Sequence, residues 1–259
     1  HHDHFGVVDG HVHPGAIDNA SGVAMALTIA SGFANLARKG ALERSVIVLF
    51  TTAEESGFLG SRAFFNARPS IVSGVRLVAD VNLDLGASWG RFEDCVVIGE
   101  ERSFLGDVFR RAAASEGVRL SREPEPGAGY FFRGDQWEFH RAGIPAVWLF
   151  MGTKLEGKTI EESRAIHSKF ISEVYHQQQD RFSEQLDMKG LVQQARIAAR
   201  AILEITSGNE LPLMKSIGVV RSRFSEQTGT PVQPKLVSDT VDSRAKIIID
   251  ARFRRALQD

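Results

Sequence analysis

The chain has 259 residues, which is enough for one large α/β domain or two small ones. It is 43% hydrophobic and 24% charged with a formal net charge of −1, so it lacks the basic surface of a nucleic-acid-binding protein. No apolar run approaches the ~20 residues of a membrane span, and the single cysteine, Cys95, excludes an internal disulfide and argues against a thiolate metal site.

The chain starts at HHDHFG instead of at a methionine, and no strand pattern precedes this motif. We expect further sequence, including strands of the sheet, upstream of His1. The absence of a signal peptide therefore carries no information about the compartment.

Helix and strand patterns alternate over most of the chain. Residues 18–38 have the apolar spacing of a helix, with Asp18 or Asn19 at its N-cap. Residues 45–52 are a continuous apolar run typical of a strand buried on both faces, and 58–67 are predicted to be helical.

The same reading continues toward the C-terminus. Three further strands are predicted at 75–85, 94–98 and 144–151, and two further helices at 101–116 and 187–206. This alternation predicts an α/β fold, a three-layer αβα sandwich around a central, mainly parallel (mixed) sheet.

The composition changes after Ser207. Prolines and polar stretches such as SEQTGTPVQ follow, and the last apolar run, KIIID at 246–250, could add a strand. We expect residues 208–259 to be a C-terminal extension of unknown role.

Acidic side chains stand beyond the carboxyl ends of the predicted strands, where open α/β sheets bind ligands. Glu54 and Glu55 follow the first strand. Asp84 ends the second strand, and Asp18 stands at the start of the first helix. Taken singly, these residues are ordinary: a solvated charge pair, a turn residue and a helix cap.

Histidines complete a set of groups that binds divalent metals. His1 and His176 offer imidazole nitrogen, which zinc accepts together with carboxylate oxygen. Asp3 lies two residues beyond His1, on the same side of an extended chain, and could accept the other N–H of that imidazole.

Six motifs in order resemble those of a known enzyme family. They are HHDHFG, GAIDNASGVA, TTAEESGFLGS, NLDLG, FFRGDQWEFHRAGIPAV and YHQQQD. The series resembles the co-catalytic zinc exopeptidases of metallopeptidase family twenty-eight, such as bacterial leucyl aminopeptidases and aminopeptidases S and Y. The resemblance covers residues 1–207 and implies a peptidase catalytic domain there, with the phosphorylase/hydrolase-like form of the αβα fold.

The resemblance also implies roles for individual residues. Two zinc ions are held by five metal ligands: His1, Asp18, Glu55, Asp84 and His176. Asp18 bridges the ions, Glu54 is the general base, and Asp3 orients His1. The implied reaction is attack of a metal-bridging water on a peptide bond, which releases the N-terminal residue of a peptide substrate. The habits of the family suggest an extracellular or periplasmic location.

The segment FFRGDQW is expected to lie near the substrate. Its candidate substrate-binding residues are Tyr130, Phe132, Arg133 and Asp135. Gly134 replaces a serine that is common in the family. The alternative for the aromatic residues is core packing beside the strand 144–151. His4 is expected to be structural or to support the ligands, and His11 and His13 to be exposed loop residues.

Three other functions remain open at this point. A glutaminyl-cyclase-like acyltransferase would keep the fold but use one zinc ion. A glutamate-carboxypeptidase-like hydrolase would bind a substrate carboxylate, for which Arg133 is available. An inactive receptor or binding module of the same fold is disfavoured because all the expected ligands and the base are present.

Overall fold

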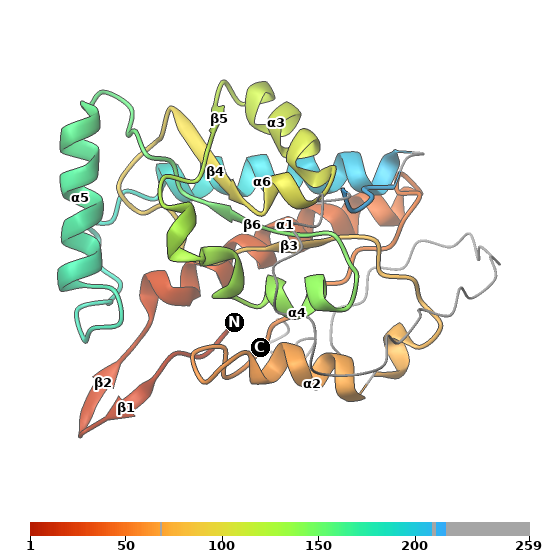
Figure 1. Ribbon diagram of the computed structural model, residues 1–259, viewed down its shortest axis with the longest axis horizontal. Helices are drawn as coiled ribbons and strands as arrows, with labels where there is room; N and C mark the ends of the chain where they lie inside the picture. Colours follow the sequence, from red (N-terminus) through yellow and green to blue (C-terminus); the bar gives the residue numbers. More distant parts are fainter. Residues whose placement is uncertain (68, 209–210, 216–259) are drawn as a thin grey trace, which may run out of the picture.

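The computed structural model describes residues 1–67, 69–208 and 211–215 (Figure 1). The predicted strand 246–250 and most of the expected C-terminal extension lie outside the described residues.

A mixed sheet stands at the centre of the fold. Its strands run in the order β3 (Asp80–Asn82), β6 (Ala146–Phe150), β4 (Asp94–Ile98) and β5 (Arg119–Ser121). The pairs β3–β6 and β4–β5 are parallel, whereas β4 and β6 are antiparallel. The expected α/β fold with a mixed sheet is therefore confirmed.

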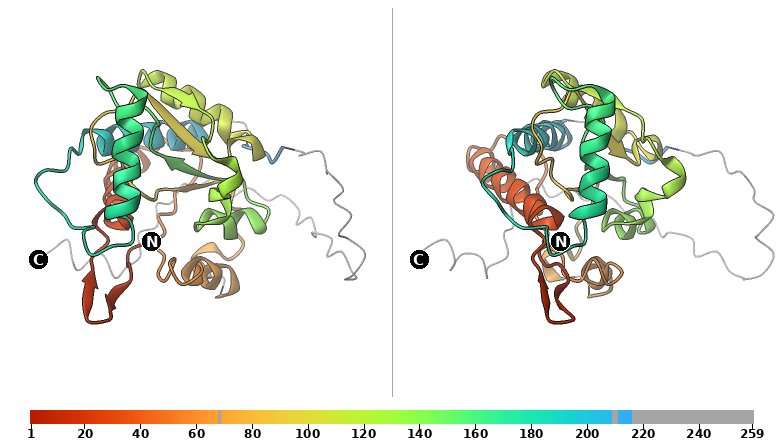
Figure 2. Two further views of the ribbon diagram at one scale, coloured as in Figure 1. Left: turned by 60° about the vertical axis from the view of Figure 1, so that its left-hand side comes forward. Right: turned by 90° about the vertical axis from the view of Figure 1, so that its left-hand side faces the viewer.

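Helices cover both faces of this sheet. They are α1 (Ser21–Arg38), α2 (Leu59–Ala67), α3 (Leu105–Ser115), α4 (Gln136–Arg141), α5 (Ile160–Glu173) and α6 (Lys189–Ser207). α6 packs against α1 and α3, and α4 packs against β3, β6 and α2. Figure 2 shows α1 and α6 on one side of the sheet and α4 on the other.

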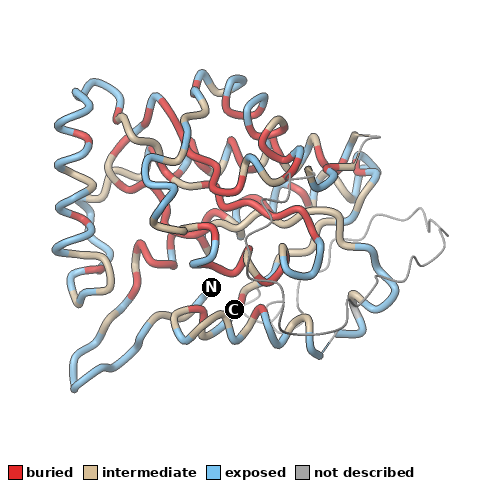
Figure 3. The backbone as a smooth tube through the Cα atoms, viewed as in Figure 1, coloured by how far each residue is buried: buried red, intermediate tan, exposed pale blue. Residues whose placement is uncertain are grey.

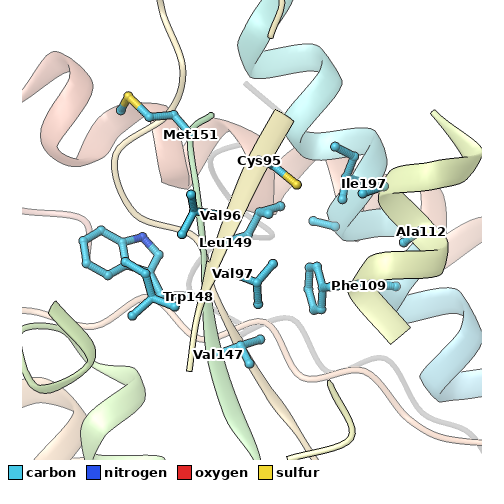
Figure 4. Close-up of a cluster of buried hydrophobic side chains, with 14 of the residues drawn as sticks. Cys95, Val96, Val97, Phe109, Ala112, Val147, Trp148, Leu149, Met151 and Ile197 are labelled. Atoms are coloured by element: carbon cyan, nitrogen blue, oxygen red, sulfur yellow. The ribbon is translucent and has the colours of Figure 1, made fainter. Parts of the chain in front are cut away.

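The main core fills the space between the sheet, α3 and α6. Val97 and Leu149, which are partners across the β4–β6 ladder, face Phe109 of α3 and Ile197 of α6 (Figure 4). Trp148 points to the opposite side of β6, as the alternation of side chains along a strand requires. Figure 3 shows that burial is concentrated in these strands and in the helix faces toward them, while α5 is largely exposed.

Two strand predictions need correction. The segment 45–52 forms no strand among the described residues: it has a single β-bridge residue, Ile47, and near its end the His2 N–H donates to the Thr51 carbonyl at 3.0 Å. Of the predicted strand 75–85, only Asp80–Asn82 pairs with β6. The apolar runs therefore predicted strands in these segments, but an apolar run does not show whether another strand lies beside it for pairing.

The helix and strand predictions at 58–67, 94–98, 144–151 and 187–206 are confirmed within a few residues, and the helix predicted at 101–116 starts later, at Leu105. The first helix begins at Ser21 instead of residue 18. Asn19 Oδ1 accepts the Gly22 N–H at 3.0 Å and satisfies a free donor of the first turn. Asp18 does not cap the helix, because its carboxylate faces His1 and His176. The elements β5, α4 and α5 were not predicted.

A hairpin missed by the sequence reading projects from the body of the fold (Figure 1). It joins β1 (Gly6–Val8) to β2 (His11–His13) through Asp9 and Gly10, both with positive φ, as two-residue hairpin turns require. His11 and His13, expected in a loop, lie on β2.

By length and composition alone, the segment 16–38 could cross a membrane. The core helix of a globular protein meets the same criteria. Here the helix of that segment packs along α6, and the turn before it carries a buried aspartate.

Candidate metal centre

Loops around one end of β3 carry the predicted site residues. Asp84 lies two residues beyond β3, and Asp18 lies in the turn Ala16–Ala20 that leads into α1. His1, Asp18, Glu54 and Asp84 are all buried, at 3–7% exposure. Charged groups are this deeply buried only when they pair with one another or bind a metal.

The backbone is strained around these residues. Ala53, Leu85 and His176 have positive φ values of 54°, 57° and 61°. Side chains other than glycine rarely take this conformation, and such strain collects at functional sites. Ala53 precedes Glu54 and Leu85 follows Asp84, so the strained backbone residues are the direct neighbours of two of the buried acidic residues.

His1 gathers one group of carboxylates. Its Nε2 lies 3.1 Å from Asp18 Oδ1, 3.7 Å from Asp84 Oδ2 and 4.0 Å from Glu54 Oε2. The ligand atoms of His1, Asp18 and Asp84 all lie within 4.8 Å of one another. This spacing suits one small cation.

The other oxygen of Asp18 faces a second group. His176 Nε2 lies 3.1 Å from Asp18 Oδ2 and 3.3 Å from Glu55 Oε2. Asp18 therefore presents one oxygen to His1 and the other to His176, which is the arrangement of a carboxylate that bridges two cations.

The orientation of His1 is set by a backbone group. His1 Nδ1 lies 2.6 Å from the Asp3 carbonyl oxygen, which only accepts, so Nδ1 carries a proton and Nε2 faces the carboxylates. The expected partner was the Asp3 carboxylate. That carboxylate instead accepts the Thr52 hydroxyl at 2.6 Å and the Ala53 N–H at 3.0 Å, and so holds the start of the Glu54–Glu55 segment.

The pKa values reflect crowded carboxylates. Burial and the charge of Asp84 raise the pKa of Glu54 to about 9. Burial lowers the pKa of His1, but the hydrogen bond to Asp18 and the nearby carboxylate of Asp84 outweigh it and raise this pKa to about 12. Burial also raises the pKa of Asp84, while the hydrogen bond from His1 and the nearby imidazole of His176 hold the pKa of Asp18 below its usual range despite burial. The site thus attracts positive charge.

Several polar atoms of the cluster fit a metal better than a hydrogen-bond network. The atoms Asp84 Oδ1, Glu55 Oε1, His176 Nε2 and both ring nitrogens of His4 are buried without a hydrogen-bond partner among the described residues. Leaving such groups unpaired costs ~1–3 kcal/mol each. Carboxylate oxygens and imidazole nitrogens without sulfur are ligands for zinc, so the residues present fit that metal.

The geometry is compatible with two roles for Glu54. The ligand atoms of His1, Glu54 and Glu55 also lie within 4.8 Å of one another. Glu54 is therefore placed either to bind a cation or to act on a group bound beside it.

Asp180 is a supporting residue that was not singled out in the sequence. It is fully buried, and its carboxylate accepts the Ile17 N–H at 2.8 Å and the Asp18 N–H at 2.9 Å. Its carbonyl also accepts the Ala16 N–H. The only signal was its place four residues after His176 in YHQQQD.

The predicted substrate-binding residues divide into two places. Asp135 is buried, accepts the Thr51 hydroxyl, and contributes to the raised pKa of Glu54. Arg133 stacks over the Tyr130 ring at 5.7 Å, and Phe132 packs against Trp137 at 4.9 Å. No contact joins Tyr130, Phe132 or Arg133 to the carboxylate cluster within the described part of the chain.

Comparisons with known proteins bear on the sequence family and the fold. The sequence model of Peptidase family M28 matches residues 1–202. No curated protein matches the chain.

Two solved structures share the fold. The LapA aminopeptidase of Legionella pneumophila is 16% identical with a TM-score of 0.54, over 79% of this chain and 50% of that one. BSAP, a zinc aminopeptidase from Bacillus subtilis, is 22% identical with a TM-score of 0.52, over 76% of this chain and 44% of that one. The chain thus spans about half the length of these two structures.

Proposed function

The chain belongs to peptidase family M28, and from that premise we propose that it is a zinc-dependent aminopeptidase with two metal ions. The observation that carries the proposal is the placement of Asp18 between His1 and His176, one carboxylate oxygen toward each imidazole. The two structural neighbours, an aminopeptidase and a zinc aminopeptidase, support the reaction and the metal.

The residues divide between the two ions around Asp18. His1 and Asp84 would hold the first ion, Glu55 and His176 would hold the second, and Asp18 would serve both. Bound zinc supplies Lewis-acid chemistry: it lowers the pKa of bound water and stabilises negative charge on a carbonyl oxygen.

Glu54 moves the proton. Its carboxylate is buried beside His1 and Asp84, with Oε2 4.0 Å from His1 Nε2, within reach of a group bound at the cluster. It takes the proton of the attacking water and gives it to the leaving amine, which departs neutral. Asp3 and Asp135 do not touch the reacting atoms: Asp3 holds His1 and Ala53, and Asp135 holds Thr51.

The substrate is a peptide with a free N-terminus. The four carboxylates of the cluster balance the charge of two Zn²⁺ ions. Asp135, which lies near Glu54, adds a further negative charge that favours an α-ammonium group over a substrate carboxylate. Tyr130, Phe132 and Arg133 form a neighbouring aromatic and cationic surface that we propose to contact the peptide beyond its first residue. We further propose that residues 1–207 are the catalytic domain and that the enzyme acts outside the cytoplasm.

The test is hydrolysis by the purified chain, stripped of metal and then reloaded with zinc. Leucine p-nitroanilide should be cleaved only after zinc is added, and its N-acetyl derivative should not be cleaved. Release of a C-terminal glutamate from a blocked peptide, or cyclisation of an N-terminal glutamine, would show a different reaction at the same site. Zinc binding without turnover of any of these substrates would indicate a binding protein.

A further inference from the structure

His4 lies inside the metal centre, although the sequence placed it outside the ligand set. Its side chain is 2% exposed. The ring contacts Phe5 with a centroid separation of 4.5 Å and His176 with a separation of 5.7 Å. It therefore stands next to the proposed second ion.

Gly15 fixes where His4 can be. A Cβ atom on Gly15 would come within 2.5 Å of His4 Cβ, 2.8 Å of His4 Cγ and 2.2 Å of the Asp18 carbonyl oxygen. The loop that carries Asp18 and the segment that carries His4 thus pack in direct contact, with glycine as the only residue that fits between them.

The polar contacts of His4 do not form hydrogen bonds. Nδ1 lies 2.8 Å from Glu55 Oε1, yet the pair lacks hydrogen-bond alignment, and neither ring nitrogen has a partner among the described residues. The ligand atoms of His4, Asp18 and Glu55 all lie within 4.8 Å of one another. Ligand atoms on one tetrahedral zinc ion are about 3.4 Å apart, so a small adjustment brings these three onto one ion.

We propose that His4 is a ligand of the second zinc ion, together with Asp18, Glu55 and His176; this inference rests on the proposed function. The second ion then has four protein ligands and a closed coordination sphere. The first ion has three, His1, Asp18 and Asp84, and keeps an open position. Glu54 Oε2 lies 4.0 Å from His1 Nε2, a ligand atom of the first ion.

The two ions are consequently unequal. A site with four protein ligands binds zinc more tightly and exchanges it more slowly than one that keeps a position for water. The alternative is that His4 only orients Glu55 through a hydrogen bond, in which case both ions keep an open position.

The test counts the imidazoles bound to metal. The chain is loaded with ¹¹³Cd, and correlations between imidazole ring protons and ¹¹³Cd are recorded. Three histidine ring systems should couple to ¹¹³Cd. Two would overturn the role of His4 and leave the proposed function standing; none would overturn the metal centre itself.

A pair of variants assigns the third imidazole. His4→Ala should remove one coupled ring and raise the dissociation constant of the tighter metal ion by at least ~10-fold. His13→Ala, in the adjacent hairpin, should leave three coupled rings. Should His4→Ala fail to fold, His4→Gln keeps the volume and is read in the same way. Three coupled rings in a folded His4 variant would contradict the proposal.

Discussion

Asp18 and Asp180 are 162 positions apart in the sequence, yet the Asp18 N–H donates a 2.9 Å hydrogen bond to Asp180 Oδ2. The neighbouring Ile17 N–H is bound by the other oxygen of the same carboxylate. Asp180 follows His176 by four residues. One buried carboxylate therefore ties the loop of a proposed bridging ligand to the loop of another ligand.

The first prediction concerns this link. Asp180→Asn keeps the volume but leaves one of the two N–H donors facing an amide N–H₂, so the turn that carries Asp18 must shift. Removal of a group that positions a ligand costs ~10–100-fold in metal affinity. Zinc affinity, measured by competition with a chromogenic chelator, should fall by this factor.

Asp94→Asn is the matched control. Asp94 is equally buried, and its Oδ1 accepts the N–H groups of Thr153 and Lys154 at 2.9 and 2.8 Å, away from the metal centre. This variant should lose stability while keeping wild-type zinc affinity. If both variants lose zinc affinity alike, Asp180 acts only through general stability.

The second prediction compares two glycines with positive φ. Gly15→Ala creates a clash with the Asp18 carbonyl and His4, whereas Gly143, with a φ of +80°, has no atom within 4 Å of an added Cβ. Gly143→Ala should cost only the backbone strain, ~1–2 kcal/mol. Gly15→Ala should cost more in urea unfolding and should also bind less zinc. Equal losses in the two variants would mean that the close contact at Gly15 is relieved elsewhere.

The third prediction separates the base from the ligands. Glu54→Gln removes the proton acceptor and should lower turnover of leucine p-nitroanilide by at least ~100-fold. Zinc content should stay at the wild-type value because the proposed mechanism assigns no ion to Glu54. Loss of zinc from this variant would make Glu54 a ligand instead.

Glu138→Gln serves as the control for a buried glutamate. Glu138 binds Arg62 at 3.0 Å and Arg141 at 3.1 Å on α4. Its loss should lower the unfolding temperature and leave turnover intact.

The fourth prediction is a dependence of stability on pH. Burial and the charge of Asp135 raise the pKa of Asp80 from 3.8 to about 8. Between these two values the unfolded chain loses a proton that the folded chain keeps, so the free energy of unfolding falls as pH rises through this window. In chelated protein, Asp80→Asn should show a weaker fall than wild type between pH 5 and 8.

Asp107→Asn, on the surface of α3, should follow the wild-type curve. Parallel curves for Asp80→Asn and wild type would show that Asp80 ionises freely in the folded chain. Urea unfolding at each pH provides the measurement.

The strands that the sequence predicted well are those whose neighbours are also strong apolar runs. β4 and β6 pair with each other and are buried on both faces, so hydrophobicity alone located them. The run 45–52 is as apolar, but pairing depends on a neighbour that composition does not reveal. The short elements β5 and α4 contain polar residues and gain their order from tertiary contacts.

The convergence of these side chains was predictable from the sequence, but the groups that support them were not. The motifs named the side chains that converge around Asp18, because each motif carries its own acidic or imidazole group. The role of the Asp3 carbonyl, the Asp180 clamp and the placement of His4 depend on the path of the backbone. The order of side-chain types in a motif does not predict these three backbone-dependent features.

The most direct test of the account is anomalous scattering at the zinc absorption edge from a crystal of the zinc-loaded chain. Two peaks are expected, one on each side of the Asp18 carboxylate, the first next to His1 and Asp84 and the second next to Glu55 and His176. A map with no peak at Asp18, or with zinc bound only elsewhere on the chain, would contradict the account.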